Sequence, residues 1–347
     1  MTFRPTLRVH LLILAMLLPG LACRAVTGFL DEEEQFAAPT PPTAQVSPVT
    51  GEPQQDAGLA CPSTTSAILA AATEFYEDDS GEEEAEEPEE QYLVTYLVTG
   101  DEISDPYFED IPQEWVVYQE DEATHREIWG FFTNLIPLEE RAALAEFSIV
   151  TDGQDNLLAA VAQTYNDPER WALEVDILDT DDKRNLAYTL IHEYAHLLTL
   201  GPSQVTPSLA IFDNPDDEDI YYQEASACPQ YFPGEGCAQP DAYLNDFFDR
   251  FWVDIYAEWQ DVNLIEDDDA YYEALDEFYY KYEDHFVTDY AATNPEEDIA
   301  EAFAFFVLSP RPAGNTIAEE KMLFFYEYPE LARVREQIVA NICASNR

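Results

Sequence analysis

The order of secondary-structure patterns predicts an α+β fold, in which a small sheet precedes a run of helices. Runs rich in strand-forming residues occupy positions 92–98, 147–150, 157–165 and 171–178. After residue 181, apolar residues recur mainly at helical spacing. Strands gathered in one part of a chain and helices in another indicate α+β, rather than a parallel sheet with alternating helices.

The first 22 residues are predicted to be a secretory signal. Basic residues precede the apolar run Leu11–Leu18, which is too short to span a bilayer as a helix. Cys23 follows small and apolar residues, as does the lipidated cysteine of a bacterial lipoprotein. We expect an extracellular or cell-surface protein whose membrane attachment is a lipid on Cys23. Plain cleavage near Ala22 or Ala25 is the alternative.

Residues 23–90 are predicted to be a disordered tether with an acidic tract. Proline, threonine, glutamine and alanine are abundant in residues 37–60, which is typical of an extended linker. Residues 77–90 are densely acidic, and the repulsion between like charges opposes compaction. The folded domain is therefore expected to span residues 91–347.

Within this domain the early part contains a helix and several turns. Residues 115–118 form a short apolar segment, and residues 122–135 are predicted to be helical. Turn signals at residues 152–153 and 166–168 separate the later strands and favour a meander.

The later part is predicted to be a series of helices. Acidic residues at 181 and 182 suit the first turn of a helix that ends at Gly201-Pro202. Further helices are expected at residues 243–259, 270–282, 295–308, 316–327 and 330–342.

The net charge of −57, from 15 basic and 72 acidic residues, restricts the partners of the protein. Such a surface repels nucleic acid and anionic lipid headgroups, so we expect no nucleic-acid partner. Carboxylates are also calcium ligands, but the chain lacks a complete D-x-D-x-D-G loop. A strongly solvated surface is the simpler interpretation of the charge.

Four cysteines remain if Cys23 carries a lipid, and four can pair in an oxidising compartment. Cys228 and Cys237 are close enough in sequence to close one short loop. That choice leaves Cys61 with Cys343, which would tie the two ends of the domain together. Four cysteines allow three connectivities, and this pairing is the one we prefer.

The motif His192-Glu193-Tyr194-Ala195-His196 carries the chemistry. Two histidines four residues apart share one face of a helix, so both imidazoles can reach one zinc ion. Glu193 can accept a proton from a water molecule on that ion. The chain has only five histidines, and two of them stand at ligand spacing. We expect one Zn²⁺ per chain and a monomer that hydrolyses peptide or protein substrates. Histidines satisfied by ordinary hydrogen bonds are the alternative.

The third zinc ligand must come from another segment, because the chain does not continue the motif with the glycine and histidine of the metzincins. Glu297 and Glu301 share one face of a predicted helix, so Glu297 could bind zinc while Glu301 accepts a hydrogen bond from a ligand histidine. Two alternatives remain open. Asn294 could cap this helix and use Glu297 in a capping box, and His285 could be the third ligand.

The segment from Tyr290 to Phe303 resembles the catalytic domain of the anthrax lethal factor family. In that family a tyrosine precedes the zinc-ligand glutamate by seven residues, and A-E-A-F closes the motif. The resemblance implies a zincin-like metallopeptidase fold, with Glu297 as ligand and Tyr290 acting on the oxyanion or the leaving group. From about Gln91 onward the chain also resembles bacterial zinc metallopeptidase lipoproteins. The interval between His196 and Glu297 is longer than in the toxin, so its substrate specificity is not carried over.

Two further functions compete with a peptidase. The first is a catalytically inactive, metal-binding surface protein on the same scaffold. A catalytically inactive protein would not require Glu193 as a proton acceptor, and this residue is present. The second is a calcium-dependent surface protein in which the histidine motif is accidental, and it predicts bound calcium in place of zinc.

Overall fold

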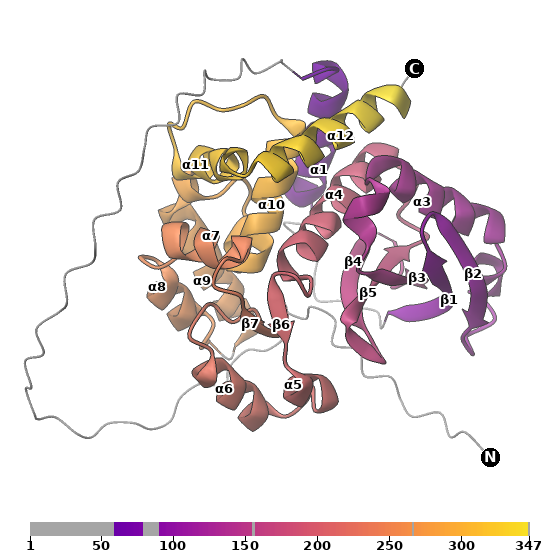
Figure 1. The fold of residues 1–347 in the computed structure, drawn as a ribbon, viewed down its shortest axis with the longest axis horizontal. Helices are drawn as coiled ribbons and strands as arrows, with labels where there is room; N and C mark the ends of the chain where they lie inside the picture. The colour runs from indigo at the N-terminus through magenta and orange to yellow at the C-terminus, as the bar shows by residue number, and fades with distance from the viewer. Residues whose placement is uncertain (1–58, 79–89, 155–156, 266, 346–347) are drawn as a thin grey trace, which may run out of the picture.

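The computed structural model describes residues 59–78, 90–154, 157–265 and 267–345 (Figure 1). The predicted signal, Cys23 and nearly all of the predicted linker lie outside these residues, as does most of the acidic tract. The described part contains no helix that is both long and apolar enough to cross a membrane.

The strands are β1 (Gln91–Thr99), β2 (Glu102–Phe108), β3 (Leu144–Thr151), β4 (Ala159–Thr164), β5 (Asp167–Asp176), β6 (Val205–Pro207) and β7 (Gly236–Ala238). The helices are α1 (Pro62–Asp78), α2 (Val116–Gln119), α3 (Glu122–Leu135), α4 (Lys183–Leu200), α5 (Leu209–Asp213), α6 (Glu218–Ala227), α7 (Tyr243–Phe251), α8 (Tyr256–Val262), α9 (Asp268–Lys281), α10 (Pro295–Leu308), α11 (Ile317–Phe324) and α12 (Pro329–Ser345). Short 3-10 turns include η2 (Glu283–His285) and η3 (Tyr290–Ala292).

The main sheet has five strands in the order β2-β1-β3-β5-β4. The predicted meander is wrong, because β5 lies between β3 and β4 and runs parallel to β3. Burial explains the order. From Trp171 to Asp176, β5 is buried at every position, which suits a central strand, whereas β4 has buried and half-buried positions and forms the edge.

The arrangement confirms the α+β class. In Figure 1 the sheet and α3 form one side of the molecule, helices α7, α8, α9 and α11 gather on the other, and α12 runs across the top. Helices α4 and α10 pack against each other between these two parts. Both helices are buried over most of their length, so side chains that meet between them are shielded from water.

Helix α1 corrects the predicted domain boundary. It lies within residues 23–90, which we expected to be a disordered tether, and it packs against α4. Ile68 and Ala72 are buried, and the disulfide between Cys61 and Cys343 joins the start of α1 to α12. Tertiary contacts and a covalent link therefore hold this segment, and the folded domain begins before Gln91.

Other elements agree with the sequence or differ in detail. Helices α3 and α10 have the predicted bounds. The single helix expected at residues 243–259 is two helices, α7 and α8. Strand β2 and helices α5 and α6 were not predicted. Both preferred disulfides, Cys61–Cys343 and Cys228–Cys237, are formed.

Candidate metal centre

Helix α4 brings the two histidines of the motif together. The side chain of Asp182 caps its first turn by accepting a hydrogen bond from the backbone N–H of Arg184, at 2.9 Å. Uninterrupted helix from there places His192 and His196 one turn apart, with their Nε2 atoms separated by 3.0 Å. Both side chains are buried. The two imidazoles therefore aim one nitrogen each at the same point.

Helix α10 supplies a carboxylate that faces the two histidine nitrogens. Asn294 caps the helix by accepting a hydrogen bond from the backbone N–H of Glu297, at 2.8 Å, and Pro295 follows as its first residue. The Oε2 atom of Glu297 lies 2.9 Å from Nε2 of His192 and 3.3 Å from Nε2 of His196. The backbone of Glu297 thus takes part in the cap while its carboxylate faces the histidines. Asn294 therefore caps the helix as predicted, but the carboxylate that a capping box would use contacts His192 and His196 instead.

The spacing of these three atoms suits a tetrahedral zinc ion. Two donors that each lie about 2.0–2.1 Å from such an ion are about 3.3 Å apart. The three distances between the two Nε2 atoms and Oε2 are 2.9, 3.0 and 3.3 Å. Burial alone would raise the pKa of Glu297, but the charge of His196 and hydrogen bonds with both histidines lower it below its ordinary value. The carboxylate is therefore ionised, as a metal ligand must be.

A second carboxylate from the same helix fixes the orientation of His192. The Oε1 atom of Glu301 lies 2.8 Å from Nδ1 of His192 and accepts a hydrogen bond from the hydroxyl of Tyr188, at 2.7 Å. Its Oε2 accepts a hydrogen bond from Thr288, at 2.6 Å. Glu301 is fully buried, so these partners hold it in one geometry. With Nδ1 donating to Glu301, Nε2 is the ring nitrogen that faces Glu297 and His196 and that would be available to a metal ion.

Two partners of Glu301 were missed by sequence analysis. Tyr188 stands one helical turn before His192, so its place on the same face of α4 could have been predicted from spacing. Thr288 lies outside both helices, and no sequence pattern marks it.

The same contacts act on the protonation of His192. Burial lowers the pKa of His192, but hydrogen bonds to Glu297 and Glu301 raise it well above its ordinary value.

Glu193 lies beside the three candidate ligands. One of its carboxylate oxygens lies within 4.8 Å of a ring nitrogen of both His192 and His196. Burial raises its pKa to about 7, against the opposing charges of the histidines and a hydrogen bond from the backbone N–H of Val161 in β4. A carboxyl group with a pKa near neutrality can both take up and release a proton there.

The remaining predicted residues differ in their distance from the centre. Tyr290, in η3, has its ring centroid 6.0 Å from that of His192 and is half-buried. His285, in η2, packs against Tyr282 and Phe286. Within the described residues, Glu297 and not His285 makes the third contact with the two histidines of α4.

Asp152, Asp176 and Asp179 form a separate acidic group after strands β3 and β5. One oxygen from each lies within 4.8 Å of the others. Asp176 is fully buried and accepts hydrogen bonds from the backbone N–H groups of Asp152 and Leu178, at 2.9 and 2.6 Å. This all-oxygen group differs in chemistry from the nitrogen-rich centre on α4.

Comparison of the chain with protein-family models, with curated proteins and with solved structures gave no match.

Proposed function

We propose that the protein is a zinc-dependent peptidase with a zincin-like fold. The observation that carries the proposal is the position of Glu297, whose Oε2 lies within 3.3 Å of Nε2 of both His192 and His196. Two imidazoles and one carboxylate, brought together from two helices, are a ligand set of catalytic zinc sites that leaves one position for water.

The chain's own groups provide the proton transfers of hydrolysis. A bound zinc ion would polarise the scissile carbonyl and lower the pKa of a water molecule to about 7. Glu193 accepts the proton of the attacking water and later donates it to the leaving amine, as its position beside the ligands allows. Tyr290 lies next to His192 and donates a hydrogen bond to the developing oxyanion.

We further propose that the protein acts outside the cytoplasm on peptide or protein substrates. Two disulfides support this location, because such bonds persist in oxidising compartments and are rare in the cytosol. The predicted signal and the lipid on Cys23 belong to the same proposal.

The substitution Glu193→Gln separates a peptidase from an inactive metal-binding scaffold. It keeps the size of the side chain but removes the proton acceptor, so we expect bound zinc to remain and hydrolysis of a randomised peptide mixture to fall by about 100-fold or more. Glu336→Gln, an exposed position on α12, is the matched control. Undiminished hydrolysis in the Glu193→Gln protein would contradict the proposal. Calcium without zinc in the purified wild-type chain would favour the calcium-dependent alternative.

A further inference from the structure

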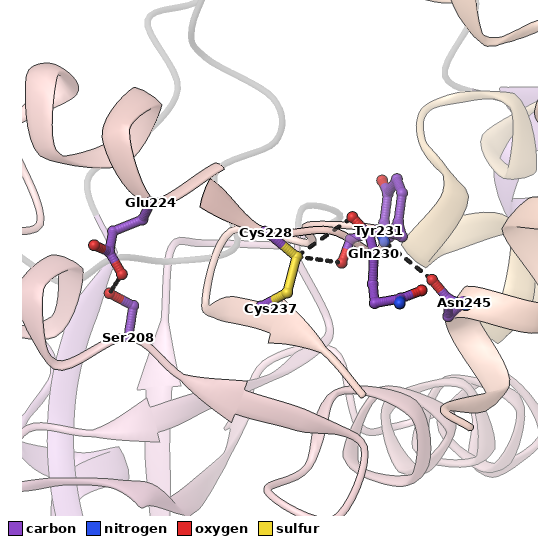
Figure 2. The surroundings of a disulfide bond; sticks show 7 residues. All are labelled: Ser208, Glu224, Cys228, Gln230, Tyr231, Cys237 and Asn245. Atoms are coloured by element: carbon purple, nitrogen blue, oxygen red, sulfur yellow. Dashed lines mark hydrogen bonds between the residues drawn. A yellow bond between two sulfur atoms is a disulfide. The ribbon is translucent and has the colours of Figure 1, made fainter. Parts of the chain in front are cut away.

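Glu235 lies in a loop that the disulfide between Cys228 and Cys237 closes, and Figure 2 shows this disulfide. Strand β7, which follows Glu235, pairs with β6 directly after α4. A side chain at Gly236 would meet the carbonyl oxygen of Thr206 at 2.0 Å, so only glycine permits this pairing. The carbonyl of Glu235 also accepts a hydrogen bond from the backbone N–H of Ser208, at 2.8 Å. The backbone of Glu235 is therefore fixed relative to the end of α4.

The other side of the loop is fixed as well. The backbone N–H of Tyr231 donates to Oδ1 of Asn245 in α7, at 3.0 Å, as Figure 2 shows. The hydroxyl of Tyr231 reaches α10 and donates to both carboxylate oxygens of Glu296, at 3.0 and 3.1 Å. Glu296 directly precedes the candidate zinc ligand Glu297. The loop thus connects Glu235 to the start of α10.

Glu235 and Glu296 are two acidic groups for which the described residues provide no salt-bridge partner. The Oε2 atom of Glu235 is buried and accepts no hydrogen bond within the described part of the chain. Burial raises the pKa of Glu235 to about 7, and the nearby charge of His196 opposes this rise. Glu235 interacts electrostatically with Glu296, so the two carboxylates lie near each other. Among the salt bridges of the described residues, none includes either carboxylate.

Three tyrosine rings lie near the two carboxylates. The ring of Tyr231 lies 6.2 Å from that of Tyr256, measured between centroids. The third ring, that of Tyr221, packs against Phe232 of the loop with 5.4 Å between centroids, and it interacts electrostatically with Glu296 and Glu235. Aromatic faces attract cations, and carboxylates accept charge-assisted hydrogen bonds from them.

We propose that Glu235 and Glu296, together with Tyr221, Tyr231 and Tyr256, form an acidic subsite that binds an arginine or lysine side chain of the peptide substrate beside the scissile bond. This inference rests on the proposed peptidase function. The adjacency of Glu296 to Glu297, and the nearness of Glu235 to His196, place the subsite at the edge of the candidate metal centre. A cation bound there would give both carboxylates a salt-bridge partner.

The test compares pairs of peptides that differ only by arginine or its uncharged analogue citrulline, at each position flanking the cleaved bond. For the wild-type chain, we expect kcat/KM to favour arginine at one position by about 10–100-fold, the range for a hydrogen-bonded charged group. In the Glu235→Gln protein this ratio should approach one, with zinc content equal to that of the wild type. Glu218→Gln, an exposed position on nearby α6, should keep the wild-type ratio.

Three results would overturn the subsite. The first is an unchanged arginine-to-citrulline ratio in the Glu235→Gln protein. The second is an equal loss for all peptides together with weaker zinc binding, which would mean that Glu235 acts by positioning His196. The third is a second zinc ion in the wild type that Glu235→Gln removes.

A binding measurement separates failure of the subsite from failure of the peptidase proposal. The Glu193→Gln protein, loaded with zinc, is titrated with each arginine peptide and its citrulline counterpart in a calorimeter. Tighter binding of the arginine peptide, abolished by adding Glu235→Gln, supports the subsite even if the wild-type chain hydrolyses neither peptide. Equal binding of the two peptides would overturn the subsite whatever the hydrolysis result.

Discussion

The Nδ1 atom of His192 lies 2.8 Å from Oε1 of Glu301, inside a contact between two helices that excludes water. The two residues are far apart in sequence, and the packing of α10 on α4 brings them together. This hydrogen bond fixes which nitrogen of His192 carries a proton, and so determines which nitrogen can bind a metal ion.

Glu301→Gln tests whether this contact serves the metal centre. The amide has nearly the same size but loses the charge that orients the imidazole, so we expect zinc affinity to fall by about 10–100-fold. Competition with a chelator of known affinity measures the change, with Glu336→Gln as control. Wild-type zinc affinity in the Glu301→Gln protein would show that Glu301 has only a structural role.

The buried ion pair of Lys321 and Asp298 predicts a large effect on stability. Both side chains are fully buried, with Nζ 2.5 Å from Oδ2, and Trp252 donates to the same oxygen at 2.7 Å. Lys321→Met leaves the carboxylate of Asp298 buried without its cation, so we expect the free energy of unfolding to fall by about 3–5 kcal/mol.

Lys281→Met is the matched control for this measurement. Its Nζ lies equally close to a carboxylate, that of Glu258, but the pair is exposed. Water screens such a pair, so urea unfolding should change little. Similar losses in the two variants would mean that burial does not set the strength of these contacts.

Glu174 predicts a dependence of stability on pH. Tyr92 donates to its carboxyl group at 2.7 Å, and burial, followed by the charge of Glu90, raises its pKa to about 8 from an ordinary value of 4.5. Between these two pH values the folded state binds more protons than the unfolded state, so this group makes the protein less stable as pH rises. The contribution is at most about 5 kcal/mol.

The substitution Glu174→Gln should therefore flatten the profile. We expect the loss of unfolding free energy between pH 5 and pH 8.5 to be smaller in this variant than in the wild type, as measured by urea titration at each pH. Glu169→Gln, an exposed position on the same strand, should leave the profile unchanged. A steeper loss in the Glu174→Gln protein would contradict the assigned direction of the shift.

Local signals explain which parts of the fold could be predicted. Asp121 caps helix α3 by accepting a hydrogen bond from the backbone N–H of Thr124, and Asn294 caps α10, with Pro295 as the first helical residue. Such caps are read from a few neighbouring residues. Helix α1 has no such local capping signal that sequence analysis could use. It is held by burial of Ile68 and by a disulfide to the far end of the chain, and neither is visible in its own sequence.

In the candidate site, too, some features follow from the local sequence and others from tertiary packing. The spacing of His192 with His196, and of Glu297 with Glu301, follows from helix geometry within one segment. That the two pairs meet depends on helix packing. Sequence analysis proposed the meeting from the spacing of Glu297 and Glu301, and the family resemblance implied it as well. Glu235 had no signal at all, because its position comes from the pairing of β6 with β7.

Zinc content of the full chain, wild type beside Glu297→Ala, tests the proposed centre most directly. After loading with zinc and removal of excess metal, we expect one zinc ion per folded wild-type chain and per Glu336→Gln chain. Glu297→Ala removes one of three ligands, so its zinc should be lost or held far more weakly, while circular dichroism shows that it remains folded. A folded wild-type chain that retains no zinc, or a Glu297→Ala chain that binds zinc as tightly as the wild type, would contradict the proposed centre.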